Sequence, residues 1–207
     1  MNHCLAFPWL MLVTEPQDDL PGTVERAVSG GVNAVQWRDN VTPIQALRSQ
    51  ASAMRTAVPR PNALIVNSNL AFEDFPCADG LHMPEWRNSK PKVLEGQRIL
   101  IGRSVHSVEG AKKAADEGAD YIVVGTIFAS KSHPEVIPQG LQLITRSAWV
   151  VDIPIIAIGG ITPENLKDCI KSGASGVAVL SPIMRAAAPY QTAKAYRKAL
   201  DIAWSER

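Results

Sequence analysis

The sequence predicts an α/β fold, a single (β/α)8 TIM barrel that takes up residues 1–207 as one domain. Short apolar runs recur along the chain with helical segments between them. Several runs are apolar at consecutive positions, such as Ile-Ile-Ala-Ile at 155–158, which is typical of parallel strands buried on both faces. Eight runs in 207 residues leave about 26 residues for each unit, near the lower size limit of this barrel. An open, doubly wound sheet is the competing fold, but eight similar units without a topological break favour the barrel.

The apolar runs give the expected strands directly. In chain order they lie at 9–14, 33–38, 63–68, 80–83, 98–104, 121–128, 154–159 and 176–181. In the second run Trp37 alternates with Gln36 and Arg38, so we expect its side chain to pack beneath the surrounding helices. No low-complexity tract or linker interrupts the pattern, and a second domain is not expected.

Start and stop signals mark the helices. Ser107 is the expected N-cap of a helix that runs to about Gly118, with small residues on its buried face. Thr162 followed by Pro163 predicts an N-cap with proline at the first helical position of another helix, which Gly173 ends. In that helix Cys169 falls on the apolar face, so we expect it in the core.

Composition and charge exclude several classes of partner. The chain has 21 basic and 20 acidic side chains, so it lacks the basic excess expected of a protein that binds nucleic acid or an anionic membrane. Its uncharged stretches, such as 172–184, are shorter than the about 20 apolar residues of a spanning helix. No basic segment precedes the first apolar run, so no signal peptide is expected. Three cysteines without CxxC spacing argue against a disulfide scaffold or a zinc site, and a cytoplasmic location is the default.

In a (β/α)8 barrel the chemistry lies on the loops that follow the strands, and a phosphate often binds after strands 7 and 8. Strand 7 is followed by Gly159 and Gly160, which let a backbone approach a ligand closely. After strand 8, Ser181 is the expected cap of a short helix whose N–H groups at Ile183 and Met184 would be free for an anion. A phosphorylated ligand is therefore predicted, although a tight turn and an ordinary cap would explain the same residues.

Polar side chains follow the other strands. They are Gln36 and Arg38, Asn67 and Ser68, His82, Ser104 and His106, and, in the loop 129–140, Ser130, Lys131, Ser132 and His133. Because Arg38 would lie within a buried strand, it needs an anionic ligand or a structural carboxylate. A histidine at the mouth of a barrel can serve as an acid–base group, whereas a hydrogen-bonded core histidine is the alternative, especially for His82. No metal-ligating cluster is visible.

Five strings together resemble a known family. They are Val-Gln-Trp-Arg at 35–38, Ile-Gly-Arg-Ser-Val-His-Ser at 101–107, Gly-Ala-Asp-Tyr at 118–121, Ala-Ile-Gly-Gly-Ile-Thr at 157–162 and Gly-Val-Ala-Val-Leu-Ser at 176–181. In this order and spacing they are similar to the thiamine phosphate synthase and TenI-type thiazole tautomerase family. The resemblance covers essentially the whole chain. It implies the barrel fold, a role in thiamine biosynthesis, a small phosphorylated thiazole as ligand and, commonly, a homodimer.

A synthase of this family joins a thiazole phosphate to a pyrimidine methyl diphosphate with Mg²⁺ and releases pyrophosphate. Gln36, Arg38 and Asn67 match its pattern. Three other positions depart from it: Asn40 stands where the family has lysine, and Ser68 and Arg87 stand where it has the two metal-binding aspartates. Glu85 could substitute as a metal ligand. Mg²⁺ prefers oxygen ligands, so a cation in place of a carboxylate opposes its binding.

The half of the site that holds the thiazole phosphate matches the family better. The resemblance assigns it to hydroxyls of the loop after strand 6, the glycines after strand 7 and a serine after strand 8, which here are Ser130, Ser132, Gly159, Gly160 and Ser181. Leu180, which precedes that serine, and Ser104 complete the expected substrate-binding set. A chain that keeps the residues for the thiazole phosphate but lacks those for the metal and the diphosphate resembles a thiazole tautomerase.

A tautomerase moves a proton within a thiazole carboxylate phosphate and needs an acid–base group but no metal. The histidine that the resemblance assigns to this role is replaced by Thr126, so His106 and His133 are the expected proton shuttles. The sequence thus favours a metal-independent tautomerase without a cofactor. The alternatives are a thiamine phosphate synthase, for which Mg²⁺ would be required, and a silent protein that binds a thiazole or thiamine phosphate.

Overall fold

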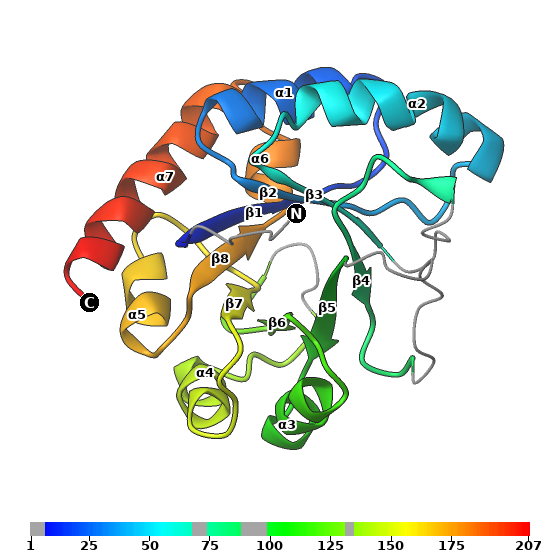
Figure 1. Cartoon of the computed structure of the whole chain (residues 1–207). Coiled ribbons are helices and arrows are strands. Elements are labelled where there is room, and N and C mark those ends of the chain that lie inside the picture. Colours follow the sequence, from blue (N-terminus) through cyan, green and yellow to red (C-terminus); the bar gives the residue numbers. More distant parts are fainter. Residues whose placement is uncertain (1–6, 68–73, 88–98, 131–134) are drawn as a thin grey trace.

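The chain folds into a closed barrel of eight parallel strands, as predicted. The computed structural model describes residues 7–67, 74–87, 99–130 and 135–207. Neighbouring strands pair in sequence order, and β1 closes the barrel by pairing with β8 (Figure 1). The strands are β1 (Trp9–Val13), β2 (Ala34–Trp37), β3 (Ala63–Asn67), β4 (Gly80–Met83), β5 (Leu100–Val105), β6 (Tyr121–Val124), β7 (Ile155–Ile158) and β8 (Gly176–Val179).

Most strands end earlier than their apolar runs suggested. The clearest case is β6, which ends at Val124 although the run 121–128 was expected to be extended throughout. The apolar run continues because Ile127 is buried in the core after the strand has ended. Position 68 of the third run and position 98 of the fifth lie outside the described residues.

Helices surround the barrel on its outer side (Figure 1). They are α1 (Leu20–Ser29), α2 (Ile44–Ala57), α3 (Val108–Asp116), α4 (Leu141–Ala148), α5 (Leu166–Lys171), α6 (Ser181–Met184) and α7 (Pro189–Ser205). The predicted cap of α3 is confirmed, because Ser107 Oγ accepts a hydrogen bond of 2.9 Å from the Gly110 N–H. None of the described helices has the length and apolar character that a membrane span requires.

The predicted start of α5 at Thr162 and Pro163 was wrong. Residues 163–165 form a turn, and the helix begins at Leu166. The side chain of Asn165 organises this turn: its Oδ1 accepts from the Thr162 N–H at 2.8 Å, and its Nδ2 donates to the Gly160 carbonyl at 2.9 Å. These bonds tie the start of α5 to the end of β7.

The apolar core has two parts, one inside the barrel and one between the barrel and its helices. The inner part includes Trp9, Met11, Ile65 and Tyr121, and the outer part is larger. As predicted, Trp37 belongs to the outer part, where it packs edge-on against Phe75 with ring centroids 5.1 Å apart. Cys169 is also buried there, as expected, and burial raises the pKa of its thiol to about 12.

Candidate functional site

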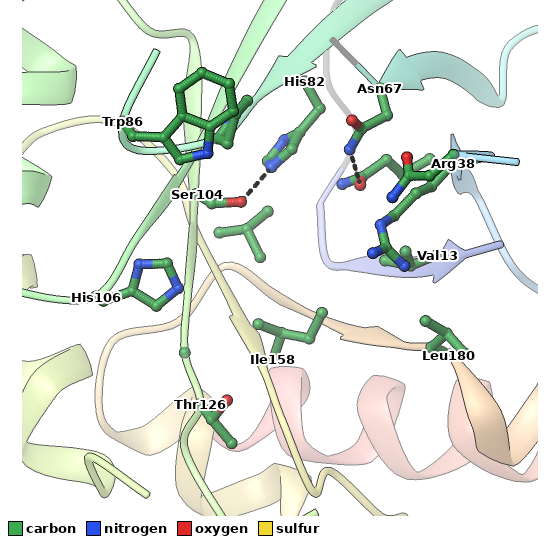
Figure 2. A pocket seen from close by; sticks show the side chains of 15 residues that line it. Val13, Arg38, Asn67, His82, Trp86, Ser104, His106, Thr126, Ile158 and Leu180 are labelled. Carbon is green, nitrogen blue, oxygen red and sulfur yellow. Dashed lines mark hydrogen bonds between the residues drawn. The ribbon is translucent and has the colours of Figure 1, made fainter. Parts of the chain in front are cut away.

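A pocket of about 400 Å³ opens at the carboxyl end of the barrel (Figure 2). Every strand contributes a side chain at or just beyond its carboxyl end. The lining residues are Val13, Gln36, Arg38, Asn40, Asn67, His82, Pro84, Trp86, Ser104, His106, Val123, Gly125, Thr126, Ile158 and Leu180. The pocket therefore lies where a parallel barrel gathers its functional groups.

One wall of the pocket carries amides and a guanidinium. On this wall Asn67 Nδ2 donates to Gln36 Oε1 at 3.1 Å, which orients both amides. The backbone of Arg38 is anchored to Thr14, whose hydroxyl accepts from the Arg38 N–H at 2.9 Å and donates to its carbonyl at 3.1 Å. Among the described residues the guanidinium of Arg38 makes no ion pair. It is a cation that an anionic ligand can use.

Asp39, the carboxylate next to Arg38, has a different role. Its Oδ1 accepts hydrogen bonds from the backbone N–H groups of Val41 and Thr42, at 3.0 and 2.8 Å. Asp39 thus fixes the loop after β2. The carboxylate that interacts electrostatically with Arg38 is that of Glu15, which is itself ion-paired with Arg185.

The floor of the pocket contains a buried histidine. His82 Nε2 lies 2.8 Å from Ser104 Oγ, and its Nδ1 lies 3.2 Å from the Tyr121 hydroxyl. Burial lowers the pKa of His82 to about 3, and the positive charge of Arg103 contributes. His82 is therefore neutral at physiological pH, which agrees with the expectation of a hydrogen-bonded core histidine.

The rim opposite the amide wall carries an exposed histidine and an exposed tryptophan. His106 Nδ1 lies 2.6 Å from Glu85 Oε2, and both side chains are accessible to solvent. This pairing orients the imidazole at the rim. Trp86 lines the same rim with 75% of its surface exposed, so its indole face is available to a flat ligand.

The structure brings many of the predicted site residues together in this pocket. Those that line it are Gln36, Arg38, Asn67, Ser104, His106, Thr126 and Leu180. Ser130, Gly159, Gly160 and Ser181 are described but do not line it. The predictions for Ser68, Lys131, Ser132 and His133 fall outside the described residues.

The two glycines after β7 have a packing role that the sequence alone did not reveal. Gly159 and Gly160 have φ of +101° and +62°, a region that disfavours other residues. A Cβ on Gly159 would lie 2.4 Å from Thr126 Cγ2, and one on Gly160 would lie 2.4 Å from the Ala129 carbonyl oxygen. The glycines therefore let the loop after β6 pack on the end of β7, and their role in holding a phosphate stays a prediction.

The expected anion site at the start of α6 was partly wrong. Ser181 is the first residue of this helix, not its cap, which is Leu180. The N–H groups of Ile183 and Met184, expected to be free, donate to the Leu180 carbonyl at 3.1 and 2.9 Å. The Met184 bond is the first regular i→i−4 bond of the helix, and the Ile183 bond is an i→i−3 bond that tightens its first turn.

Sequence reasoning missed some of the lining residues. Trp86 and Pro84 lie in the segment after β4 that departs from the family pattern, and this departure was the available signal. Val13, Val123 and Ile158 are apolar and looked like ordinary core positions. Strand pairing would have found one of them, because Val13 on β1 is level with Gln36 on β2.

The described residues do not fit a Mg²⁺ site. They contain no group of three His, Cys, Asp or Glu side chains placed to hold a metal ion, and no carboxylate lines the described wall of the pocket. Glu85, which could have substituted as a metal ligand, is paired with His106. Because Mg²⁺ is usually bound through carboxylate oxygens, this donor set is unsuited to it.

Comparison with known proteins places the chain in a family. A family model described as thiamine monophosphate synthase matches residues 10–183. A thiamine-phosphate synthase from Methanoculleus marisnigri is 41% identical over 165 residues, covering 76% of this chain and 77% of that protein. One from Gloeobacter violaceus is 34% identical over 91% of this chain but only 56% of its own length, so the chain spans little more than half of that relative.

A solved structure supports the fold. The thiamine phosphate pyrophosphorylase from Pyrococcus furiosus matches with a TM-score of 0.80 and 24% identity, over 94% of this chain and 96% of that one. The resemblance found in the sequence is confirmed, and the chain belongs to the thiamine monophosphate synthase family.

Proposed function

We propose that the protein is an enzyme of thiamine biosynthesis, a thiamine-phosphate synthase that joins a thiazole phosphate to a pyrimidine methyl diphosphate. The observation that carries this proposal is the wall formed by Gln36, Arg38 and Asn67 at the ends of β2 and β3. The family resemblance assigns residues of these types, at these positions, to the synthase. The names of the curated relatives support the same activity.

In this proposal the amide wall binds the diphosphate. The methylene carbon loses its bond to the diphosphate oxygen, whose electron pair goes to the leaving diphosphate, and it forms a new bond to the ring nitrogen of the thiazole. The guanidinium of Arg38 would stabilise that charge, because Arg38 has no ion pair among the described residues and its backbone is held by Thr14. The amide of Asn67, oriented by Gln36, would fix the position of the same group. No step is assigned to Mg²⁺, because the described residues do not fit it.

Two observations favour a second candidate, the thiazole tautomerase. The described pocket wall lacks the carboxylates on which the synthase pattern depends, and His106 is paired with Glu85 at the rim, where it could move a proton. Thr126, which stands where the tautomerases have their histidine, lines the pocket but has no acid–base function near neutral pH.

Parallel assays would separate these functions. The purified protein would receive the thiazole phosphate and the pyrimidine methyl diphosphate, with Mg²⁺ or with EDTA, and thiamine phosphate would be measured. A second assay would follow aromatisation of the thiazole carboxylate phosphate. The synthase proposal expects thiamine phosphate to form, with a large loss in Arg38→Met and little loss in His106→Gln. If only aromatisation occurs and His106→Gln abolishes it, the protein is a tautomerase and the synthase proposal is wrong. If the protein binds the substrates tightly but turns over neither, it is a silent binding protein and both enzyme proposals are wrong.

A further inference from the structure

Three neighbouring strands place two polar side chains side by side beneath the pocket. His82 on β4 pairs in register with Gly102 on β5, and Gly102 pairs with Tyr121 on β6. A Cβ on Gly102 would lie 2.1 Å from Tyr121 Cζ, so only glycine leaves room for the ring at this position. Because Gly102 has no side chain, Tyr121 reaches across β5 to His82, and their ring centroids are 5.8 Å apart.

These two side chains form a chain of hydrogen bonds that ends at the pocket. The Tyr121 hydroxyl is 3.2 Å from His82 Nδ1, and His82 Nε2 is 2.8 Å from Ser104 Oγ. Tyr121 and His82 are both buried, and His82 and Ser104 contribute to the lining of the pocket, whereas Tyr121 does not. This series of hydrogen bonds therefore connects the interior of the barrel with the pocket.

The partners of Tyr121 decide which group donates and which accepts in these hydrogen bonds. Within the part of the protein that the structure describes, the Tyr121 hydroxyl has no hydrogen-bond partner other than His82. If His82 carried its proton on Nδ1, the hydroxyl proton of Tyr121 would be buried without an acceptor, which is costly. The satisfied arrangement has Tyr121 donating to Nδ1 and the Nε2–H of His82 donating to Ser104 Oγ.

The ionisation of these groups supports a fixed direction. Burial lowers the pKa of His82 to about 3, with a further contribution from Arg103, so the ring keeps one proton near neutral pH. Burial also raises the pKa of the Tyr121 hydroxyl far above its ordinary value, so it remains a donor. With its oxygen already accepting from His82, Ser104 has its own O–H left to donate into the pocket.

We propose that Tyr121 and His82 form a hydrogen-bond relay that turns the Ser104 hydroxyl into a donor toward an anionic oxygen of the ligand. Tyr121 and His82 are positioning residues in this relay, and Ser104 makes the contact. The choice of ligand rests on the proposed function, because a diphosphate supplies such oxygens. The direction of the relay is a property of the protein alone.

The direction is tested without ligand or activity. Nitrogen-15 NMR of the histidine side chains, with His82→Gln used to assign the signal, reports which ring nitrogen carries the proton. The relay requires His82 to carry it on Nε2 in the native protein at pH 7. A proton on Nδ1 would overturn the proposal even if the protein proved to be an active synthase. In Tyr121→Phe the Nδ1 partner is lost, so we expect the Nδ1–H form to become detectable.

Binding of inorganic pyrophosphate, measured by calorimetry, tests the contact at Ser104. Loss of a hydrogen bond to a charged acceptor should weaken binding about 10- to 100-fold in Ser104→Ala, and Ser104→Thr, which keeps the hydroxyl, should recover most of it. Tyr121→Phe should weaken binding in the same direction, with thermal unfolding used to verify that it is folded. Unchanged affinity in Ser104→Ala would overturn the ligand contact, and it would do so whether or not the protein makes thiamine phosphate.

Discussion

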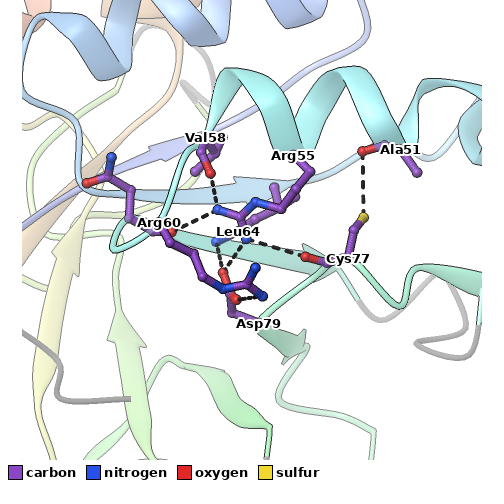
Figure 3. A network of polar contacts seen from close by, with 8 residues as sticks. Ala51, Arg55, Val58, Arg60, Leu64, Cys77 and Asp79 are labelled. Atoms are coloured by element: carbon purple, nitrogen blue, oxygen red, sulfur yellow. Dashed lines mark hydrogen bonds and ion pairs between the residues drawn. The ribbon is translucent and has the colours of Figure 1, made fainter. Parts of the chain in front are cut away.

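The two ends of the barrel both contain charged and polar side chains, but they use them differently. At the amino end Asp79, just before β4, is buried between two arginines (Figure 3). Arg55 contacts it at 2.6 Å and Arg60 at 3.0 Å, and the Leu64 N–H donates to it at 2.9 Å. Arg55 also donates to the backbone carbonyls of residues 58, 62 and 77. The buried carboxylate of Asp79 thus has all its partners within the protein.

At the carboxyl end the polar groups have fewer partners in the protein. Arg38 makes no ion pair among the described residues, and Ser104 is held by His82 on one side only. In a structural network the polar side chains are bonded to other groups of the protein, whereas in a binding site they keep bonding capacity for a ligand. In barrels of this kind polar residues at the amino end serve stability, and those at the carboxyl end serve chemistry.

The largest expected effect is at the amino end. Asp79→Ala would leave Arg55 buried without its carboxylate, and removing one partner of a buried ion pair typically costs about 3–5 kcal/mol of unfolding free energy. Urea denaturation measures this loss. Ligand affinity per folded molecule should stay at the native value, because the network lies at the opposite end of the barrel from the pocket.

A matched control distinguishes burial from charge. Asp116 pairs with Lys112 on the exposed surface of α3, at 2.9 Å. Asp116→Ala should cost no more than about 0.5 kcal/mol, as surface pairs of this kind do. Equal losses in the two variants would refute the view that the Asp79 network is a stabilising feature of the amino end.

The fold could be predicted from the sequence because each strand corresponds to its own apolar run. Helix starts were harder: Ser107 was a cap as expected, whereas Thr162 was not, because the side chain of Asn165 forms the turn instead. Such competition between local hydrogen bonds is decided by geometry that the sequence does not contain.

The pocket was predicted only in part for a similar reason. The rule of strand ends found Gln36, Arg38, Asn67 and Ser104, which all line the same pocket. It could not find the relay, because Tyr121 begins its strand and reaches His82 only through the space above Gly102. Gly102 lies between His82 and Tyr121 only because of the register in which the three strands pair. The apolar runs of the sequence predict the strands but not this register.

The buried histidine at the carboxyl end should make the stability of the protein depend on pH. His82 has a folded pKa of about 3 against a reference value of 6.5, so below pH 6.5 the unfolded chain binds a proton that the folded protein does not. Its contribution to stability is fully present above pH 6.5 and falls as the pH is lowered toward 3. Between pH 7 and pH 5 we expect a loss of about 2 kcal/mol from this group.

Urea denaturation of the native protein and of His82→Gln at both pH values isolates this contribution. The native protein should lose about 2 kcal/mol more than the variant between pH 7 and pH 5, whatever the variant's stability at pH 7. Equal losses would mean that His82 titrates normally in the folded protein. That result would also remove the support that its neutral ring gives to the relay.

The smallest effect is expected at the rim of the pocket, where a side chain serves binding without serving stability. Trp86 lines the pocket with 75% of its surface exposed, so Trp86→Ala should change the free energy of unfolding by less than about 0.5 kcal/mol. If its indole stacks on a heterocyclic ring of the ligand, the variant should bind thiamine phosphate about fivefold more weakly, since such contacts contribute about 1 kcal/mol. Trp149, which is 81% exposed just after α4 and does not line this pocket, provides the matched control. Quenching of tryptophan fluorescence by the ligand should therefore diminish in Trp86→Ala and persist in Trp149→Ala, and the reverse pattern would show that the ligand does not contact this rim.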